Sequence, residues 1–114
     1  MKTTIERLDG ACVVRVSGEL AGHESGLSDF VREVTDQFDA GGVVIELSEV
    51  SYVNSAGLGA LIRIVSQANT QEVRVILAGA RPILTGLLEV TRLDRFFESV
   101  GSEDEGLQQL RSGK

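Results

Sequence analysis

The chain has 114 residues, of which 42% are apolar and 25% charged, with seventeen acidic side chains against eleven basic ones. Such a length suits one domain, and we expect residues 1–114 to form a single one. The formal net charge of −6 disfavours binding to the phosphates of nucleic acid. No apolar run reaches the roughly 18 residues that span a bilayer, and the N-terminus lacks the apolar core of a signal peptide. We therefore expect a cytoplasmic protein with no nucleic-acid partner and no direct membrane insertion.

Cysteine and histidine are too scarce for a metal site. One residue of each type cannot build a zinc cluster, so we expect no metal site. We also expect no cofactor. Cys12 cannot form an internal disulfide. Because it lies among valines, it is expected to be a buried apolar residue rather than a reactive thiol.

The first predicted elements are two strands. Residues 3–8 and 11–17 have strand patterns and flank Asp9-Gly10, a dipeptide typical of a hairpin turn. The two strands should therefore be antiparallel. Cys12, Val14 and Val16 are expected on one face of the second strand. Residues 18–23 follow and are expected to form a loop.

Helix and strand patterns then alternate. Apolar residues recur at helical spacing between about 24 and 40, and a Gly-Gly pair ends that helix. Residues 43–47 are almost all apolar, as in a strand covered on both faces. The next helix places Leu58, Leu61, Ile62 and Val65 on one stripe. A second buried strand, residues 73–78, follows it.

The last third of the chain continues the alternation. Pro82 begins a third helix, a short edge strand is expected around residues 96–100, and Ser102 caps a final polar helix. The nearby acids, among them Glu98 and Glu103, are expected on a solvated face. The order β-β-α-β-α-β-α-β-α predicts an α/β fold: a single mixed sheet, with an antiparallel N-terminal hairpin plus parallel strands, and about four helices.

The junction at residues 50–59, Val-Ser-Tyr-Val-Asn-Ser-Ala-Gly-Leu-Gly, is the best candidate for a functional site. It follows a strand and begins a helix. Because α/β sheets usually place function in loops at the C-terminal ends of parallel strands, the two expected loops at residues 18–23 and 48–59 are the candidates. A helix N-terminus tolerates an anion, so Ser55 is well placed to be phosphorylated. The alternative is that Asn54 or Ser55 only caps the helix.

Two glycines follow within the first turn. Each costs roughly 1 kcal/mol of helix stability relative to alanine, which indicates a steric demand. Gly57 and Gly59 either allow close packing on the sheet or clear space for another protein to approach Ser55. The spacing leaves both open.

The junction lacks most of the residues that an active site would need. A serine nucleophile needs a base, and the sole histidine, His23, lies on the other candidate loop. No aspartate stands in an obvious orienting position, and Ser55 is not in a Gly-x-Ser-x-Gly elbow. The Gly57-Leu58-Gly59 run is neither a dinucleotide fingerprint nor a P-loop. We expect no enzyme, with a Ser55–His23 pair as the catalytic alternative.

Nearly the whole chain resembles a STAS domain, specifically a stand-alone bacterial anti-sigma factor antagonist. The resemblance rests on three stretches: Val16-Ser17-Gly18-Glu19-Leu20, Val44-Ile45-Glu46-Leu47 with Val50, and Val53-Asn54-Ser55-Ala56-Gly57-Leu58-Gly59. It implies a small sheet with alternating helices, and Ser55 corresponds to the family's regulatory phosphoserine.

The resemblance also implies partners. The unphosphorylated form would bind an anti-sigma factor with a histidine-kinase-like ATPase fold, which acts as the serine kinase with its own ATP and magnesium. Phosphorylation of Ser55 would release it, and a metal-dependent serine phosphatase would reset the switch. The implied partner-binding residues are Glu19, Ala21, His23, Asn54, Ser55, Ala56, Gly57 and Leu58.

Two positions depart from the family pattern. Asn54 stands where the family usually has Asp, and Ala21 replaces the Asp that usually follows Gly-Glu-Leu. Both fall within the implied docking surface. They motivate a second hypothesis, in which the STAS-like module regulates a membrane transporter or another partner-switching assembly that does not act on a sigma factor.

Overall fold

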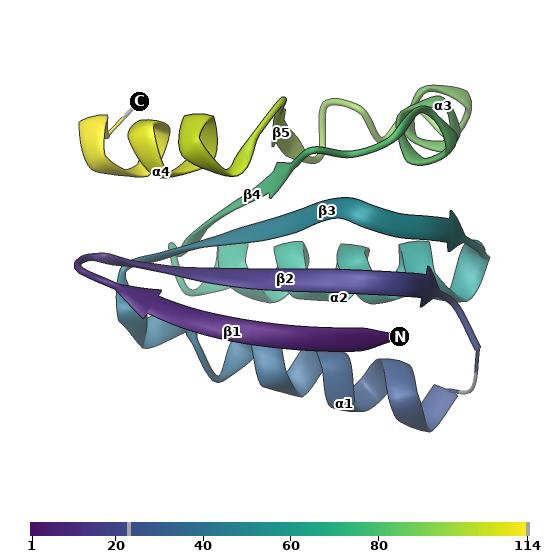
Figure 1. Ribbon diagram of the computed structural model, residues 1–114, viewed down its shortest axis with the longest axis horizontal. Coiled ribbons are helices and arrows are strands. Elements are labelled where there is room, and N and C mark those ends of the chain that lie inside the picture. The colour runs from purple at the N-terminus through teal and green to yellow at the C-terminus, as the bar shows by residue number, and fades with distance from the viewer. Residues whose placement is uncertain (23, 114) are drawn as a thin grey trace.

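The computed structural model describes residues 1–22 and 24–113, and for residues 24, 25 and 83 it describes the backbone alone. Figure 1 shows the arrangement of the elements, which follow the predicted order. They are β1 (Lys2–Leu8), β2 (Ala11–Leu20), α1 (Glu24–Thr35), the 3₁₀ helix η1 (Phe38–Ala40), β3 (Gly42–Val53), α2 (Ser55–Thr70), β4 (Arg74–Ala78), α3 (Pro82–Val90), β5 (Glu98–Val100) and α4 (Glu103–Ser112).

The strands form one five-stranded sheet in the order β1-β2-β3-β4-β5. The hairpin strands β1 and β2 are antiparallel, with Leu8 opposite Ala11 across the Asp9-Gly10 turn. The other neighbouring pairs are parallel. The predicted single mixed sheet is therefore confirmed.

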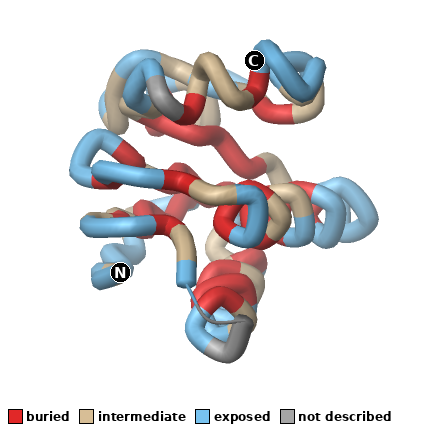
Figure 2. Tube along the Cα trace, turned by 90° about the vertical axis from the view of Figure 1, so that its right-hand side faces the viewer, coloured by how far each residue is buried: buried red, intermediate tan, exposed pale blue. Residues whose placement is uncertain are grey.

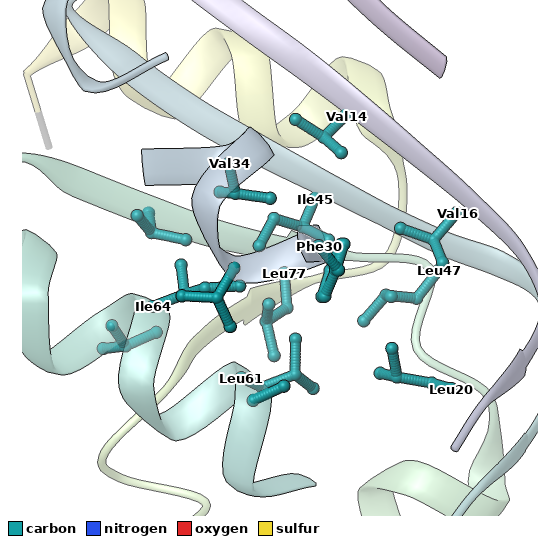
Figure 3. Packing of buried hydrophobic residues seen from close by; sticks show 14 of the residues in the cluster. Val14, Val16, Leu20, Phe30, Val34, Ile45, Leu47, Leu61, Ile64 and Leu77 are labelled. Carbon is teal, nitrogen blue, oxygen red and sulfur yellow. The ribbon is translucent and has the colours of Figure 1, made fainter. Parts of the chain in front are cut away.

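The helices divide between the two faces of the sheet. The larger core joins one face to apolar residues of α1, α2 and α3, and Figure 3 shows how residues such as Phe30, Ile45 and Leu61 converge there. On the other face a smaller cluster contains Val13 and Val44 together with Leu107 of α4. Figure 2 shows the buried residues running along the strands and the inner sides of the helices. The predicted division of β2 is confirmed, because its alternate residues enter the two clusters and Cys12 is fully buried.

Two expected loops are partly strand. Residues 18–20 belong to β2 and residues 48–53 belong to β3, although both were predicted to lie outside the sheet. The pairing between these strands shifts register between Arg15 and Ser17 and again between Gly18 and Glu19. Each irregularity breaks the alternation of apolar and polar residues, so the pattern no longer indicates a strand although the pairing continues.

The extra length of β2 and β3 positions the junction. Only Gly42–Glu46 of β3 pairs with β4, whereas the second half of β3 pairs with β2 up to Leu20 opposite Val53. The backbone N–H of Asn54 then donates to the carbonyl of Leu20 at 3.4 Å. The start of α2 is thereby fixed against the end of β2.

Three smaller expectations also need correction. The first predicted helix ends at Thr35 rather than near residue 40, because η1 takes its last turn. The buried stripe of α2 includes Ile64 in place of Ile62, which is half-buried. The C-terminal acids are not merely solvated: Glu98 pairs with Arg74, and Glu103 pairs with Arg15. The hydrogen bonds that Arg15 donates to the Glu103 carboxylate are the main reason that the pKa of Arg15 is raised.

Candidate functional site

Asn54 caps helix α2. Its backbone is extended, and its side-chain Oδ1 accepts a hydrogen bond from the N–H of Gly57 at 2.9 Å. The carbonyl of Asn54 also accepts the first helical bond, from the N–H of Leu58 at 2.9 Å. The capping role that the sequence left open between Asn54 and Ser55 therefore belongs to Asn54.

Ser55 is the first residue of α2 and is exposed to solvent. Its hydroxyl makes no hydrogen bond to any residue that the structure describes. The first turn of α2 carries no acidic side chain, so nothing on the helix itself offsets the partial positive charge of its N-terminus. An anion attached to Ser55 would thus find a favourable field and would displace no cap.

Gly57 is packed directly against the end of β2. A Cβ atom built on Gly57 would lie 1.8 Å from the carbonyl oxygen of Leu20. This oxygen belongs to the backbone of a fully buried residue, so it cannot move aside as a flexible side chain would. Close packing on the sheet is therefore the role of the first glycine.

Gly59 behaves differently from Gly57. A Cβ atom on Gly59 would meet nothing within 4 Å. The residue lines a hollow of about 520 Å³ between α1 and α2, together with Gly22, Leu27, Ala56, Ala60 and Arg63. The open space that the sequence offered as the second explanation is present at this glycine.

The implied partner-binding residues divide by exposure. Glu19, Ser55 and Ala56 are exposed, and Ala21 and Asn54 are half-buried. Gly57 and Leu58 are buried, so they shape this end of the helix from inside. His23 lies outside the described residues, and the structure gives no account of a Ser55–His23 pair.

Tyr52 is an exposed aromatic residue that the sequence analysis did not include among the partner-binding residues. It lies on β3 opposite Glu19 of β2, and 44% of its surface is accessible. Buried Val50 and Val53 frame it, three residues apart because of the irregular pairing. The available signal was a large aromatic residue directly before the Asn-Ser pair.

The site offers little for metal chemistry. Among the described residues, no group of three or more His, Cys, Asp or Glu side chains lies close enough to hold a metal ion. Burial raises the pKa of the Cys12 thiol, which lies in the core beside β1 and η1.

Among the residues that the structure describes, no helix has the length and apolar character needed to cross a membrane.

A family comparison identifies this arrangement. The model of the STAS domain matches residues 2–106. This chain belongs to the STAS domain family. The match covers all five strands and the start of α4, and it includes the whole junction at residues 50–59.

Solved structures share the fold of this STAS domain. An anti-sigma factor antagonist from Mycobacterium paratuberculosis superposes with a TM-score of 0.75 at 24% identity, over 96% of this chain and 93% of that one. SpoIIAA, an anti-sigma factor antagonist from Bacillus, gives 0.71 unphosphorylated and 0.72 phosphorylated, at 16% identity over 96% of this chain and 98% and 99% of the two SpoIIAA chains. A sulfate transporter family protein from Wolinella succinogenes gives 0.75 at 16% identity, over 90% of this chain and 85% of that one.

Proposed function

We propose that this STAS domain is a phosphorylation-switched protein-binding module of the anti-sigma factor antagonist type. In the unphosphorylated state it binds an anti-sigma factor with a histidine-kinase-like ATPase fold and so frees a sigma factor. That partner phosphorylates Ser55, which releases the complex, and a metal-dependent phosphatase restores the first state. The module itself has no catalytic role.

The exposure of Ser55 beside a separate cap is the observation that carries this proposal. Because Asn54 makes the cap bond to Gly57, the hydroxyl of Ser55 is available to a kinase without cost to the helix. A phosphate adds a charge of about −1.5 to −2 at neutral pH. At a helix N-terminus this charge leaves the fold intact, so its effect falls on the docked partner through repulsion and desolvation.

The structural neighbours support the same reading. SpoIIAA is an anti-sigma factor antagonist that exists in unphosphorylated and phosphorylated forms. Its two forms have almost equal similarity to this chain, which is compatible with a switch that acts without refolding. The absence of an acid from the first turn of α2 adds to this support, because it leaves the anion-binding end of the helix uncompensated.

Phosphate transfer to Ser55 tests the proposal. The purified protein is incubated with the anti-sigma ATPases of its own genome and ATP, and its intact mass is measured. One added phosphate is expected on wild type and on Ser51→Ala, and none on Ser55→Ala. Ser51 is the matched control, since it is exposed on the preceding strand and its hydroxyl bonds to the carbonyl of Gly18. A phosphate gained by Ser55→Ala would refute the assignment.

A second candidate keeps the fold and changes the target. The likeness to a sulfate transporter family protein favours a module that regulates a membrane transporter. Co-purification of the chain with a transporter, unaffected by Ser55→Asp, would select this candidate. Co-purification with an ATPase-fold kinase, lost in Ser55→Asp but kept in Ser51→Asp, would select the first.

A further inference from the structure

The hollow lined by Gly59 lies next to Ser55 along α2. Its rim includes Ala56, the residue that follows Ser55, and its floor includes Leu27 and Ala60, which are almost fully buried. It lies between α1 and α2, which pack side by side as Figure 1 shows. The floor is apolar and the volume is about 520 Å³, enough to accept side chains from another protein.

Distances along α2 place this hollow inside any interface centred on Ser55. Gly59 is one helical turn from Ser55, about 6 Å along the axis, and Arg63 is about 12 Å away. A standard interface covers about 800 Å² on each partner, which corresponds to a patch about 16 Å in radius. An enzyme that reaches the hydroxyl of Ser55 therefore also contacts the hollow.

Arg63 gives the hollow its charge. It is exposed, and it is the sole charged residue on the described part of the rim. The ion pairs found among described residues use Arg7, Arg15, Arg32 and Arg74, and none uses Arg63. A guanidinium at the edge of an apolar surface is complementary to a carboxylate, which it can bind through two parallel hydrogen bonds.

Gly59 keeps the hollow open at a cost to the helix. Glycine in a helix interior is about 1 kcal/mol less favourable than alanine, and no neighbour within 4 Å requires its absence of a side chain. A side chain at this position would project into the hollow. Packing within the fold therefore gives no reason for a glycine at this position.

From these observations we infer that the hollow is the specificity pocket for the partner kinase. The kinase inserts an apolar side chain over Gly59 and places an acidic residue against Arg63. This inference rests on the proposed function and adds Leu27, Gly59, Ala60 and Arg63 to the partner-binding surface. It also fixes the chemistry of the partner at this contact, which is apolar with an adjacent negative charge.

Binding of the purified anti-sigma ATPases of the same genome, each alone, tests the inference. Gly59→Leu should raise the Kd at least tenfold, because the new side chain fills the hollow. Gly86→Leu is the matched control: Gly86 is also a helical glycine with nothing within 4 Å, but it lies on α3. It should leave the Kd unchanged. Thermal unfolding of both variants checks that the fold is kept.

Charge is tested separately at Arg63. Arg63→Glu should raise the Kd at least tenfold, Arg63→Lys should raise it less, and the affinity lost by Arg63→Glu should shrink as salt is raised. Because Arg63 is exposed, these variants report on binding even where Gly59→Leu fails to fold.

The outcomes separate the two proposals. An ATPase that phosphorylates Ser55 but binds Gly59→Leu or Arg63→Glu as tightly as wild type overturns the pocket and leaves the proposed function standing. Failure of every ATPase to bind or phosphorylate the wild-type chain overturns both.

Discussion

The carbonyl oxygen of Leu20 occupies the space in which a side chain at position 57 would lie. It is 1.8 Å from the point where a Cβ atom added to Gly57 would be placed. The same oxygen accepts the N–H of Asn54 at 3.4 Å. One backbone atom at the end of β2 therefore sets both the entry and the first turn of α2. The position of Ser55 follows from this contact.

Gly57→Ala should destabilise the fold by about 3 kcal/mol or more, because the added methyl collides with backbone rather than with a movable side chain. Urea unfolding measures the loss. Gly59→Ala is the matched control, and it should stabilise by up to about 1 kcal/mol because its methyl meets nothing and favours the helix. Equal effects at the two positions would contradict the packing described for Gly57.

Asn54→Ala should lower stability by about 1 kcal/mol, because the N–H of Gly57 loses its cap acceptor. Ser55→Ala should change stability by no more than about 0.5 kcal/mol, as expected of an exposed residue outside the cap. Thermal unfolding of the two variants distinguishes the roles. A larger loss for Ser55→Ala than for Asn54→Ala would show that the serine is structural.

Asn54→Asp should raise stability by about 0.3–1 kcal/mol at neutral pH. The carboxylate keeps the cap bond and adds a negative charge at a helix N-terminus that has none. The gain should vanish as the pH falls below about 4 and should shrink in high salt. Melting temperatures at pH 7 and pH 3, with and without 1 M salt, provide the check; a gain that survives at pH 3 would have another cause.

Glu72 and Arg92 have left-handed backbone conformations, with φ of 57° and 60°. Each follows a helix that ends in a Schellman motif: the N–H of Val73 bonds to the carbonyl of Ala68, and that of Leu93 to Leu88, both at 2.8 Å. Glycine removes the strain of about 1–2 kcal/mol but increases the entropy of the unfolded chain. Glu72→Gly and Arg92→Gly should therefore each stabilise by about 0.5–1 kcal/mol. Gln71→Gly, at φ of −100°, should destabilise and serves as the control for urea unfolding.

The Arg7–Asp39 ion pair makes stability depend on pH in the acid range. A hydrogen bond from the Arg7 guanidinium, at 2.7 Å, lowers the pKa of Asp39. A carboxyl group with a lowered pKa in the folded state stabilises the fold above its unfolded pKa, about 3.9, and this contribution is lost as the pH falls through the folded value. Arg7→Ala should raise the pKa of Asp39 toward the ordinary value of an aspartate. An NMR titration of the Asp39 carboxyl measures this, and an unchanged pKa would rule out the pair in solution.

The sequence by itself determined the order of elements and the mixed sheet. Those features depend on local patterns: Asp9-Gly10 at the hairpin, helical spacing in α1 and α2, and Pro82 at the start of α3. It also located the junction at Asn54 and Ser55. Local periodicity carries this information because it records which face of each element must be buried.

Tertiary structure alone decided how the junction works. The sequence could not assign the cap to Asn54 rather than Ser55, or tell Gly57 from Gly59, because these roles depend on where the Leu20 carbonyl and the hollow beside α1 lie. The extension of β2 to Leu20 and of β3 to Val53 was missed for the same reason. Pairing between irregular strands is set by contacts between segments about 30 residues apart, and no local pattern reports them.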